Sequence, residues 1–303
     1  MFHDFTFAAT LASSPACAWQ LDDVLAPDQP LDFTRAFLPE ALARTNGLEG
    51  LSDAERRILN QIRGHEYLSI FGLVEEFILP FVLDHARPQL RGDDYRVRAL
   101  LQFATEEAKH IQLFKRFHAA FQAGFPVECK TVGPPEAVAA AVLSHDPLSV
   151  ALIILHVEWM SQIHYLDSVR DDGDIDPLFK SLLKNHWIEE AQHAKLDTLM
   201  VEALADGRDA ASIDTAIDGY LEIGAFLDEA LRSQTVFNLD AFERATGRSL
   251  SGSACDAFLA QQHQAARWTY LGTGMAHPKF RATLGAISPT GLARIDEVAR
   301  AFA

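Results

Sequence analysis

The sequence contains one five-residue motif twice, and its residue types are those that bind transition metals. Glu-Glu-Ala-Lys-His occupies residues 106–110 and Glu-Glu-Ala-Gln-His occupies residues 189–193, so the two copies are 83 positions apart. Each copy contains Glu-x-x-His, and residues i and i+3 share one face of a helix. Each motif therefore presents a carboxylate beside an imidazole, a ligand pair suited to iron or manganese.

The same spacing of 83 residues relates two further acidic residues, Glu75 and Glu158, and each of them lies in an apolar segment with helical periodicity. At about 100° per residue, Glu75 shares a helix face with Phe71, whereas Glu76 lies toward Asp84. We therefore expect Glu75 to point into the apolar interior, with Glu76 as the alternative.

The chain thus divides into two half-units, each with one helical Glu followed by one Glu-x-x-His. This is the ligand inventory of di-iron and di-manganese carboxylate bundles, and in it the sequence resembles the ferritin-like superfamily. The resemblance implies two bridging carboxylates and one further Glu and His for each metal. It assigns the bridges to Glu107 and Glu190, one coordination sphere to Glu75 and His110, and the other to Glu158 and His193.

One histidine breaks the symmetry between the half-units. His186 lies four residues before Glu190, and its counterpart at the 83-residue spacing is Phe103. In the string His186-x-x-x-Glu190-x-x-His193 the sequence is similar to the p-aminobenzoate N-oxygenase family, whose di-iron site carries a third histidine on the fourth helix. The similarity covers about residues 55–205. It implies that His186 is a seventh ligand and that an amine is the group oxidised.

Four long helices must position these residues, and the pattern predicts an all-α protein, a ferritin-like four-helix bundle with additional N- and C-terminal helices. We expect one domain over 1–303, a di-metal core over 55–205, and packed extensions over 1–54 and 206–303. On the second helix, Glu106 and Lys109 are expected to point away from the apolar stripe. The predicted core helices are 52–86, 93–123, 146–169 and 178–205, and further helical patterns cover 213–231, 256–271 and 288–302.

Composition and charge exclude several classes of function. A net charge of −16 is the opposite of the basic footprint that nucleic-acid or anionic-membrane binding needs. No uncharged apolar run is long enough to span a membrane. The three cysteines, Cys17, Cys129 and Cys255, are far apart and predict free thiols. These features predict a cytoplasmic protein.

The favoured function is a di-iron oxygenase that uses O2 as co-substrate to oxidise a small organic molecule. Two iron ions are the expected cofactor, with manganese as the alternative metal, since the ligand set is rich in oxygen and poor in thiolate. No catalytic residue is expected beyond the metal ligands. The predicted walls of the substrate pocket are Phe71, Phe103, Ile154 and Trp187.

Two alternative functions share the same metal site. A ferroxidase or iron-storage protein would handle the metal without an organic substrate. A radical-generating subunit would need a tyrosine near the metals, and Tyr165 is the residue that the pattern offers. For the oxygenase, the expected partners are an electron-donor protein or other reductant and a second copy of the chain in a homodimer. The residues do not specify the substrate.

Overall fold

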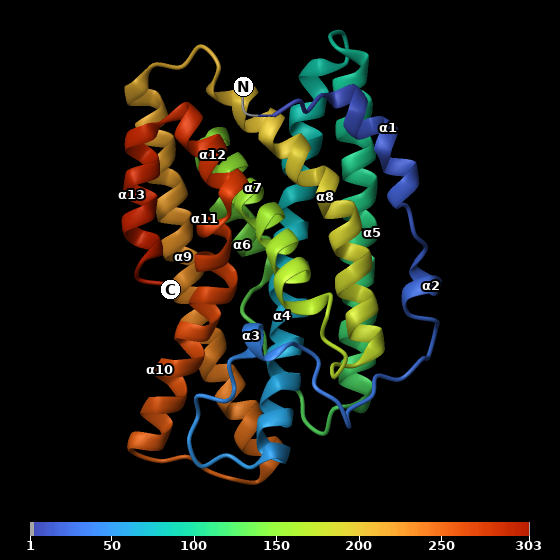
Figure 1. Ribbon diagram of the computed structural model, residues 1–303, viewed down its shortest axis with the longest axis vertical. Coiled ribbons are helices and arrows are strands. Elements are labelled where there is room, and N and C mark those ends of the chain that lie inside the picture. The colour runs from blue at the N-terminus through green and yellow to red at the C-terminus, as the bar shows by residue number, and fades with distance from the viewer. Residues whose placement is uncertain (1–2, 303) are drawn as a thin grey trace.

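The computed structural model describes residues 3–302, and its regular secondary structure consists of helices joined by loops (Figure 1). Within those residues the only β feature is an isolated bridge between Ala36 and Ile175. The prediction of an all-α protein with helices before and after a bundle is therefore confirmed.

Four long helices form the bundle, and each begins at a side chain that caps its first turn. α4 (Asp53–Ala86) starts with the capping box of Ser52 and Glu55, in which each side chain binds the other residue's backbone N–H. Asp93, Asp146 and Asp176 cap the other three in the same position. α4 packs along α5 and α7 along α8, and α5 also meets α8. The other bundle helices are α5 (Asp94–Gly124), α7 (Pro147–Ile163) and α8 (Pro177–Ala205).

Two π-helical turns interrupt helices that the sequence predicts as continuous. α7 passes into η2 (His164–Val169), and α10 (Ser253–Arg267) passes into η3 (Trp268–Gly272). The two turns face each other, because His164 Nε2 lies 2.9 Å from the Thr269 carbonyl oxygen. Such turns leave backbone groups without their usual helical partners and are frequent at functional sites.

The N-terminal segment covers the bundle on one side. α1 (Phe7–Cys17) packs on α5 and α8, next to the N-terminus in Figure 1. It is followed by two single-turn helices, α2 (Leu21–Val24) and α3 (Glu40–Ala43). A 3₁₀ turn, η1 (Arg87–Gln89), joins α4 to α5. α1 therefore buries side chains of α5 and α8 that would be exposed in a bundle of four helices alone.

The C-terminal segment covers another side, where α9 packs against both α4 and α7. α9 (Ala210–Thr246) is longer than the predicted 213–231. Beyond Leu231 the helix continues through the polar Gln234 and Asn238, which are buried and hydrogen-bonded to each other, and Gln234 also binds the Lys130 carbonyl oxygen. The remaining helices are α6 (Pro135–Leu143), α11 (Thr273–Ala276), α12 (Pro278–Ile287) and α13 (Pro289–Ala299).

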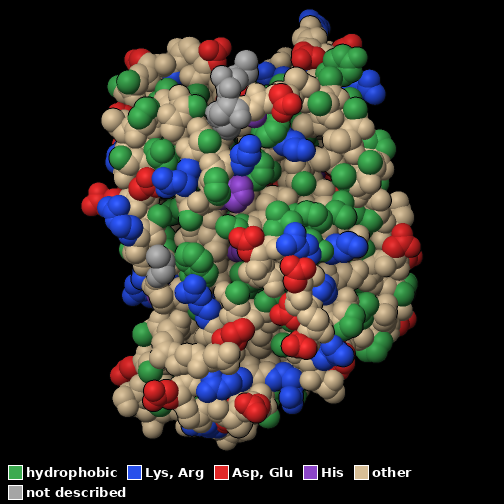
Figure 2. Space-filling view, viewed as in Figure 1, with side chains coloured by type: hydrophobic (Ala, Val, Ile, Leu, Met, Phe, Trp, Pro, Cys, Tyr) green, Lys and Arg blue, Asp and Glu red, His purple; other side chains and the backbone are tan. Residues whose placement is uncertain are grey.

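The buried apolar side chains form one continuous cluster from Trp19 to Phe302, so both terminal segments share the core of the bundle. The division into a core over 55–205 and two extensions remains a prediction. On the face shown in Figure 2, Lys and Arg side chains are interspersed with Asp and Glu. Among the described residues, no helix has the length and hydropathy needed to cross a membrane. Cys17, Cys129 and Cys255 are free, as predicted.

Candidate metal centre

Most of the predicted ligands converge in the middle of the bundle in two overlapping groups. Within each group, one ligand atom from every residue lies within 4.8 Å of the others, and all the members are buried. α4 contributes one residue, α5 two and α8 three, so helices from both half-units build each group. The first group is Glu75, His110, His186 and Glu190, and the second is Glu107, His110, Glu190 and His193.

Glu190 is the centre of the arrangement because its carboxylate faces all three histidines. Its Oε1 lies 3.0 Å from His186 Nε2 and 2.9 Å from His110 Nδ1, and its Oε2 lies 3.2 Å from His193 Nδ1. Burial alone would raise the pKa of Glu190, but the three imidazoles hold it well below its usual value. Glu190 is thus placed between the two groups, where a bridging ligand would be.

The carboxylates from α4 and α5 complete the two groups. His186 Nε2 lies 3.0 Å from Glu75 Oε1, so the asymmetric histidine reaches the Glu of the first half-unit. Glu107 Oε1 lies 2.7 Å from His193 Nδ1. Glu76 points elsewhere, since it is paired with the exposed Lys115 at 3.1 Å.

Glu158, the ligand predicted on α7, is buried beside the cluster but belongs to neither group. Burial raises the pKa of Glu158 well above its usual value, and the carboxylate of Glu190 raises it further. Two neighbouring carboxyl groups that are both buried cannot both ionise unless a cation compensates their charges. A metal ion would remove the repulsion and allow both to be charged.

The first Glu of each motif lies outside the cluster and holds the histidine of the other motif. His110 Nε2 lies 2.8 Å from Glu189 Oε2, and His193 Nε2 lies 2.9 Å from Glu106 Oε2. The prediction that Glu106 points away from the apolar side is therefore wrong: Glu106 is 4% exposed. The periodicity identified the stripe facing the bundle, but α1 covers the neighbouring face of α5 as well.

These outer carboxylates orient both rings. Because Nε2 faces a carboxylate, it carries the proton, and Nδ1 is left facing the cluster. Burial opposes protonation of His110 and His193, yet the surrounding carboxylates raise the pKa of each well above its usual value. A cation would replace the proton on Nδ1, so the rings are prepared as metal ligands, in the carboxylate–histidine–metal order found at many protein metal sites.

α1 and Trp19 cover the outer carboxylates. Ser14 Oγ donates a hydrogen bond of 2.6 Å to Glu106. Lys109 forms an ion pair with Glu189, so it does not simply point away from the site as predicted. Trp19 stacks on His110 at a ring distance of 5.9 Å. The N-terminal segment therefore shields the metal ligands from solvent on this side.

The residues fit a pair of metal ions because the cluster contains buried polar atoms that the protein does not satisfy. Several of these atoms lie close to an imidazole nitrogen of the cluster, but within the described part of the chain none has a partner in hydrogen-bonding geometry, and leaving them so is costly. Carboxylate and imidazole donors in this ratio suit iron or manganese. The unsatisfied atoms are Glu75 Oε2, both oxygens of Glu107, Glu158 Oε2, Glu190 Oε1 and His110 Nδ1.

Asp197, which lies one turn after His193 on α8, is a further buried acid that the sequence pattern did not indicate. Its side chain is fully buried, and neither oxygen has a hydrogen-bond partner among the described residues. Burial raises the pKa of Asp197 well above its usual value, and the charges of Glu107 and Glu190 act in the same direction. The only signal in the sequence was its spacing of four residues from His193, which is too common to be selective.

The four predicted pocket residues occupy different surroundings. Phe71 lies edge-on to His186, with ring centroids 5.4 Å apart, and lines an apolar cavity between α4 and α7. Phe103 packs on His193 at 4.2 Å, and Trp187 stacks on Tyr165 at 4.4 Å. These two residues and the buried Ile154 are not among the residues that line the cavity.

The fold and the buried Glu and His groups define a class, the di-metal carboxylate proteins built on a helical bundle. Comparison with known proteins defines the family. The family model for the p-aminobenzoate N-oxygenase AurF matches residues 10–216. The chain therefore belongs to the p-aminobenzoate N-oxygenase AurF family, and the prediction of a di-metal oxygenase acting on a small molecule is confirmed.

Among solved structures, the chain is similar to R2-like ligand-binding oxidases. One of these, with a Mn/Fe cofactor, is 11% identical; the alignment covers 91% of this chain and 94% of that one, with a TM-score of 0.49. A G68L mutant with an Fe/Fe cofactor is 12% identical, with coverage of 91% and 93% and a TM-score of 0.49. Such remote likeness does not define the metal of this chain. No curated protein matches it.

Proposed function

We propose that the chain is a di-iron N-oxygenase that inserts one oxygen atom of O2 into the N–H bond of a primary amine. The observation that carries the proposal is the third histidine: His186 contacts both Glu75 and Glu190 at 3.0 Å. It joins the Glu of α4 to the Glu-x-x-His pair of α8 and would give one metal an extra nitrogen donor. The proposed ligands are Glu75, Glu107, His110, Glu158, His186, Glu190 and His193.

The iron ions, when bound, would supply the electrons and the Lewis acidity needed to activate O2. The chain's own residues hold and shield the site. Glu106 and Glu189 fix the Nε2 protons of His193 and His110, and thereby aim Nδ1 at the cluster. Trp19 and α1 exclude water from the outer side. The balanced reaction is amine plus O2 plus two electrons and two protons, giving hydroxylamine and water.

The two electrons require an external reductant, and we propose an electron-donor protein for this role, in a cytoplasmic setting. A homodimer remains a prediction by analogy. The ferroxidase alternative shares the ligands but has no use for the apolar cavity beside them, which would suit an organic substrate.

The test is isotopic. The purified chain is loaded anaerobically with ferrous iron and given a chemical reductant, ¹⁸O₂ and a small panel of arylamines. We expect about two irons per chain and ¹⁸O in the N-oxygenated product by mass spectrometry. Glu107→Gln, which removes one of the proposed bridging carboxylates, is expected to abolish incorporation. Iron uptake far above this ratio without product would contradict the proposal and favour iron storage.

A further inference from the structure

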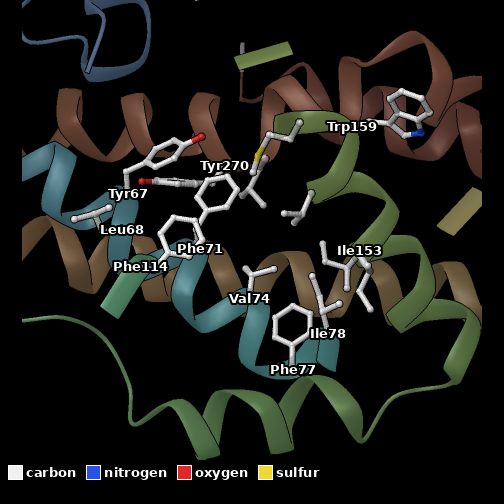
Figure 3. Close-up of a cluster of buried hydrophobic side chains, with 14 of the residues drawn as sticks. Tyr67, Leu68, Phe71, Val74, Phe77, Ile78, Phe114, Ile153, Trp159 and Tyr270 are labelled. Carbon is white, nitrogen blue, oxygen red and sulfur yellow. The ribbon is translucent and has the colours of Figure 1, made fainter. Parts of the chain in front are cut away.

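The apolar cavity lies directly behind the proposed metal ligands. Val74 and Val157 line it, and each is the residue immediately before a proposed ligand, Glu75 or Glu158. Phe71 lines it as well and contacts His186. In Figure 3, Phe71, Val74 and Phe77 extend from α4 into the space that faces α7. A molecule in this cavity would be one side chain away from the metal centre.

The walls of the cavity carry no charge. In the described part of the chain, all the lining side chains are apolar except Tyr270, whose hydroxyl is a neutral phenol, because burial raises its pKa well above the usual value and the Glu66 carboxylate raises it further. A cation, Arg63, lies 6.0 Å from the centre of the Tyr270 ring. It is buried and paired with Glu66, so its charge is already neutralised.

Most buried polar groups near the cavity serve the fold; in the described chain the Tyr270 hydroxyl and Arg63 Nε lack a hydrogen-bond partner, and the hydroxyl is uncharged. Glu66 also accepts a hydrogen bond from Asn238, and Asn238 is bonded to Gln234. Gln234 in turn accepts a hydrogen bond of 2.9 Å from the backbone N–H of Val132. This chain of contacts fixes the loop after α5 against α9. It leaves the cavity wall without an uncompensated charge that could pair with an ionised substituent.

The cavity and a surface cleft share two lining residues. Leu73 and Val132 line the cavity, and they also line a surface cleft formed by α4, α5 and residues 131–135. These two side chains therefore form the partition between the cleft and the cavity. A small displacement of the two apolar side chains would connect the cavity to solvent without breaking a side-chain hydrogen bond.

We propose that this cavity is the substrate site and that the substrate is an arylamine with no ionised group, entering past Leu73 and Val132. The proposal rests on the proposed function for its amine. An unpaired carboxylate or ammonium would lose its hydration in an apolar site, whereas an arylamine is uncharged at neutral pH. The substrate class therefore excludes both aminobenzoates and alkylamines.

The test is a binding measurement with three probes of nearly equal size. 4-Methylaniline is neutral, 4-aminobenzoate is an anion, and benzylamine, an isomer of 4-methylaniline, is a cation. Binding to the iron-loaded protein is measured anaerobically and without reductant by equilibrium dialysis. We expect 4-methylaniline to bind at least about tenfold more tightly than either charged probe. Equal or tighter binding of 4-aminobenzoate would overturn the proposal.

Two substitutions test whether the probes bind in this cavity. Leu231→Trp fills the cavity from α9 and is expected to remove 4-methylaniline binding. Val138→Arg places a guanidinium at the half-buried rim on α6, and is expected to reverse the preference in favour of 4-aminobenzoate, with Val138→Leu as the uncharged control. Because Val138→Arg is expected to bind 4-aminobenzoate more tightly than the wild type does, misfolding of the variant cannot produce the same result. Unchanged preferences in Val138→Arg, with iron content retained, would contradict the location.

The outcomes separate this proposal from the proposed function. If 4-methylaniline binds as expected and no ¹⁸O is incorporated into any arylamine, the cavity assignment stands and N-oxygenation is wrong. If ¹⁸O enters 4-aminobenzoate as readily as 4-methylaniline, N-oxygenation stands and the substrate class is wrong.

Discussion

Each histidine of the repeated motif is held by a carboxylate from the other copy. Glu106 binds His193, and Glu189 binds His110, so the two halves of the chain depend on each other for ring orientation. The two pairs are not equivalent. Glu189 is ion-paired with Lys109, whereas Glu106 is held by Ser14 and Gln102. Two bound metal ions would therefore have different surroundings, in addition to the difference made by His186.

At the residue scale we predict that Glu106→Gln lowers iron affinity by about 10- to 100-fold, the usual effect of losing a carboxylate behind a histidine ligand. The amide still fits, but it no longer fixes the Nε2 proton of His193. Affinity is measured by competition with a chelator of known strength. The matched control is Glu76→Gln, whose partner Lys115 is exposed, and iron affinity should not change in it. Equal losses in the two variants would refute the role of Glu106.

At the element scale, the two π-helical turns are joined by buried histidines. His164 Nε2 contacts the Thr269 carbonyl oxygen, and His156 Nε2 lies 3.1 Å from that of Tyr270. Two carbonyl groups of η3 thus find hydrogen-bond donors on the segment formed by α7 and η2. Because η3 carries Tyr270 into the cavity wall, these histidines position part of the proposed substrate site.

This arrangement predicts a pH dependence of stability. Burial lowers the pKa of His164 to about 3, whereas in the unfolded chain the ring titrates near 6.5. Below pH 6.5 the ring is therefore protonated in the unfolded chain but still neutral in the folded chain. The stability that the neutral ring contributes is complete above pH 6.5 and is lost as the pH falls toward 3. We expect a loss of about 1 to 2 kcal/mol from this group between about pH 6.5 and pH 5.

The measurement is urea unfolding at several pH values, compared between the wild type and His164→Gln. Glutamine still donates to the Thr269 carbonyl but does not titrate. The variant should be less stable near pH 7 and should show a flatter pH dependence, by about one proton, below about pH 6.5. Parallel pH profiles for the two proteins would show that His164 does not titrate as described.

At the scale of the whole molecule, the bundle encloses more acid than it can pair with its own cations. Glu107, Glu158 and Asp197 all have buried oxygens without a hydrogen-bond partner in the described chain. Helices α4, α5, α7 and α8 bring these groups together, so their repulsion opposes closure of the bundle itself. Metal ions that bind the folded state should relieve it.

We therefore predict that chelation of the metal lowers the midpoint of thermal unfolding. A metal present at about 100 times its dissociation constant contributes about 3 kcal/mol, which corresponds to roughly 4 to 5 °C for a chain of 303 residues. Re-addition of ferrous iron under anaerobic conditions should restore the midpoint. In Glu107→Gln, which binds metal more weakly, chelation should shift the midpoint less. A midpoint insensitive to chelation in the wild type would contradict a metal pair inside the bundle.

The sequence by itself determined the bundle and most of the cluster. Helical periodicity shows which face a residue occupies, and the 83-residue spacing selected Glu75 over Glu76 without reference to any neighbour. The capping box of Ser52 and Glu55 is also a pattern within a few residues, and α4 begins within one residue of the predicted start at 52. These features are local, so they can be recognised in a linear chain.

Only the tertiary structure decided what covers each face. Glu106 is buried because α1, about 90 positions earlier, packs over α5. The cavity wall includes Leu231 and Tyr270, which lie in the C-terminal segment that bore no recognisable motif. The π-helical turns were also not predicted; η2 and η3 contact each other through His164 and Thr269, which are about 100 positions apart in the chain. Periodicity describes one helix at a time, whereas burial, ring orientation and cavities depend on which helices meet.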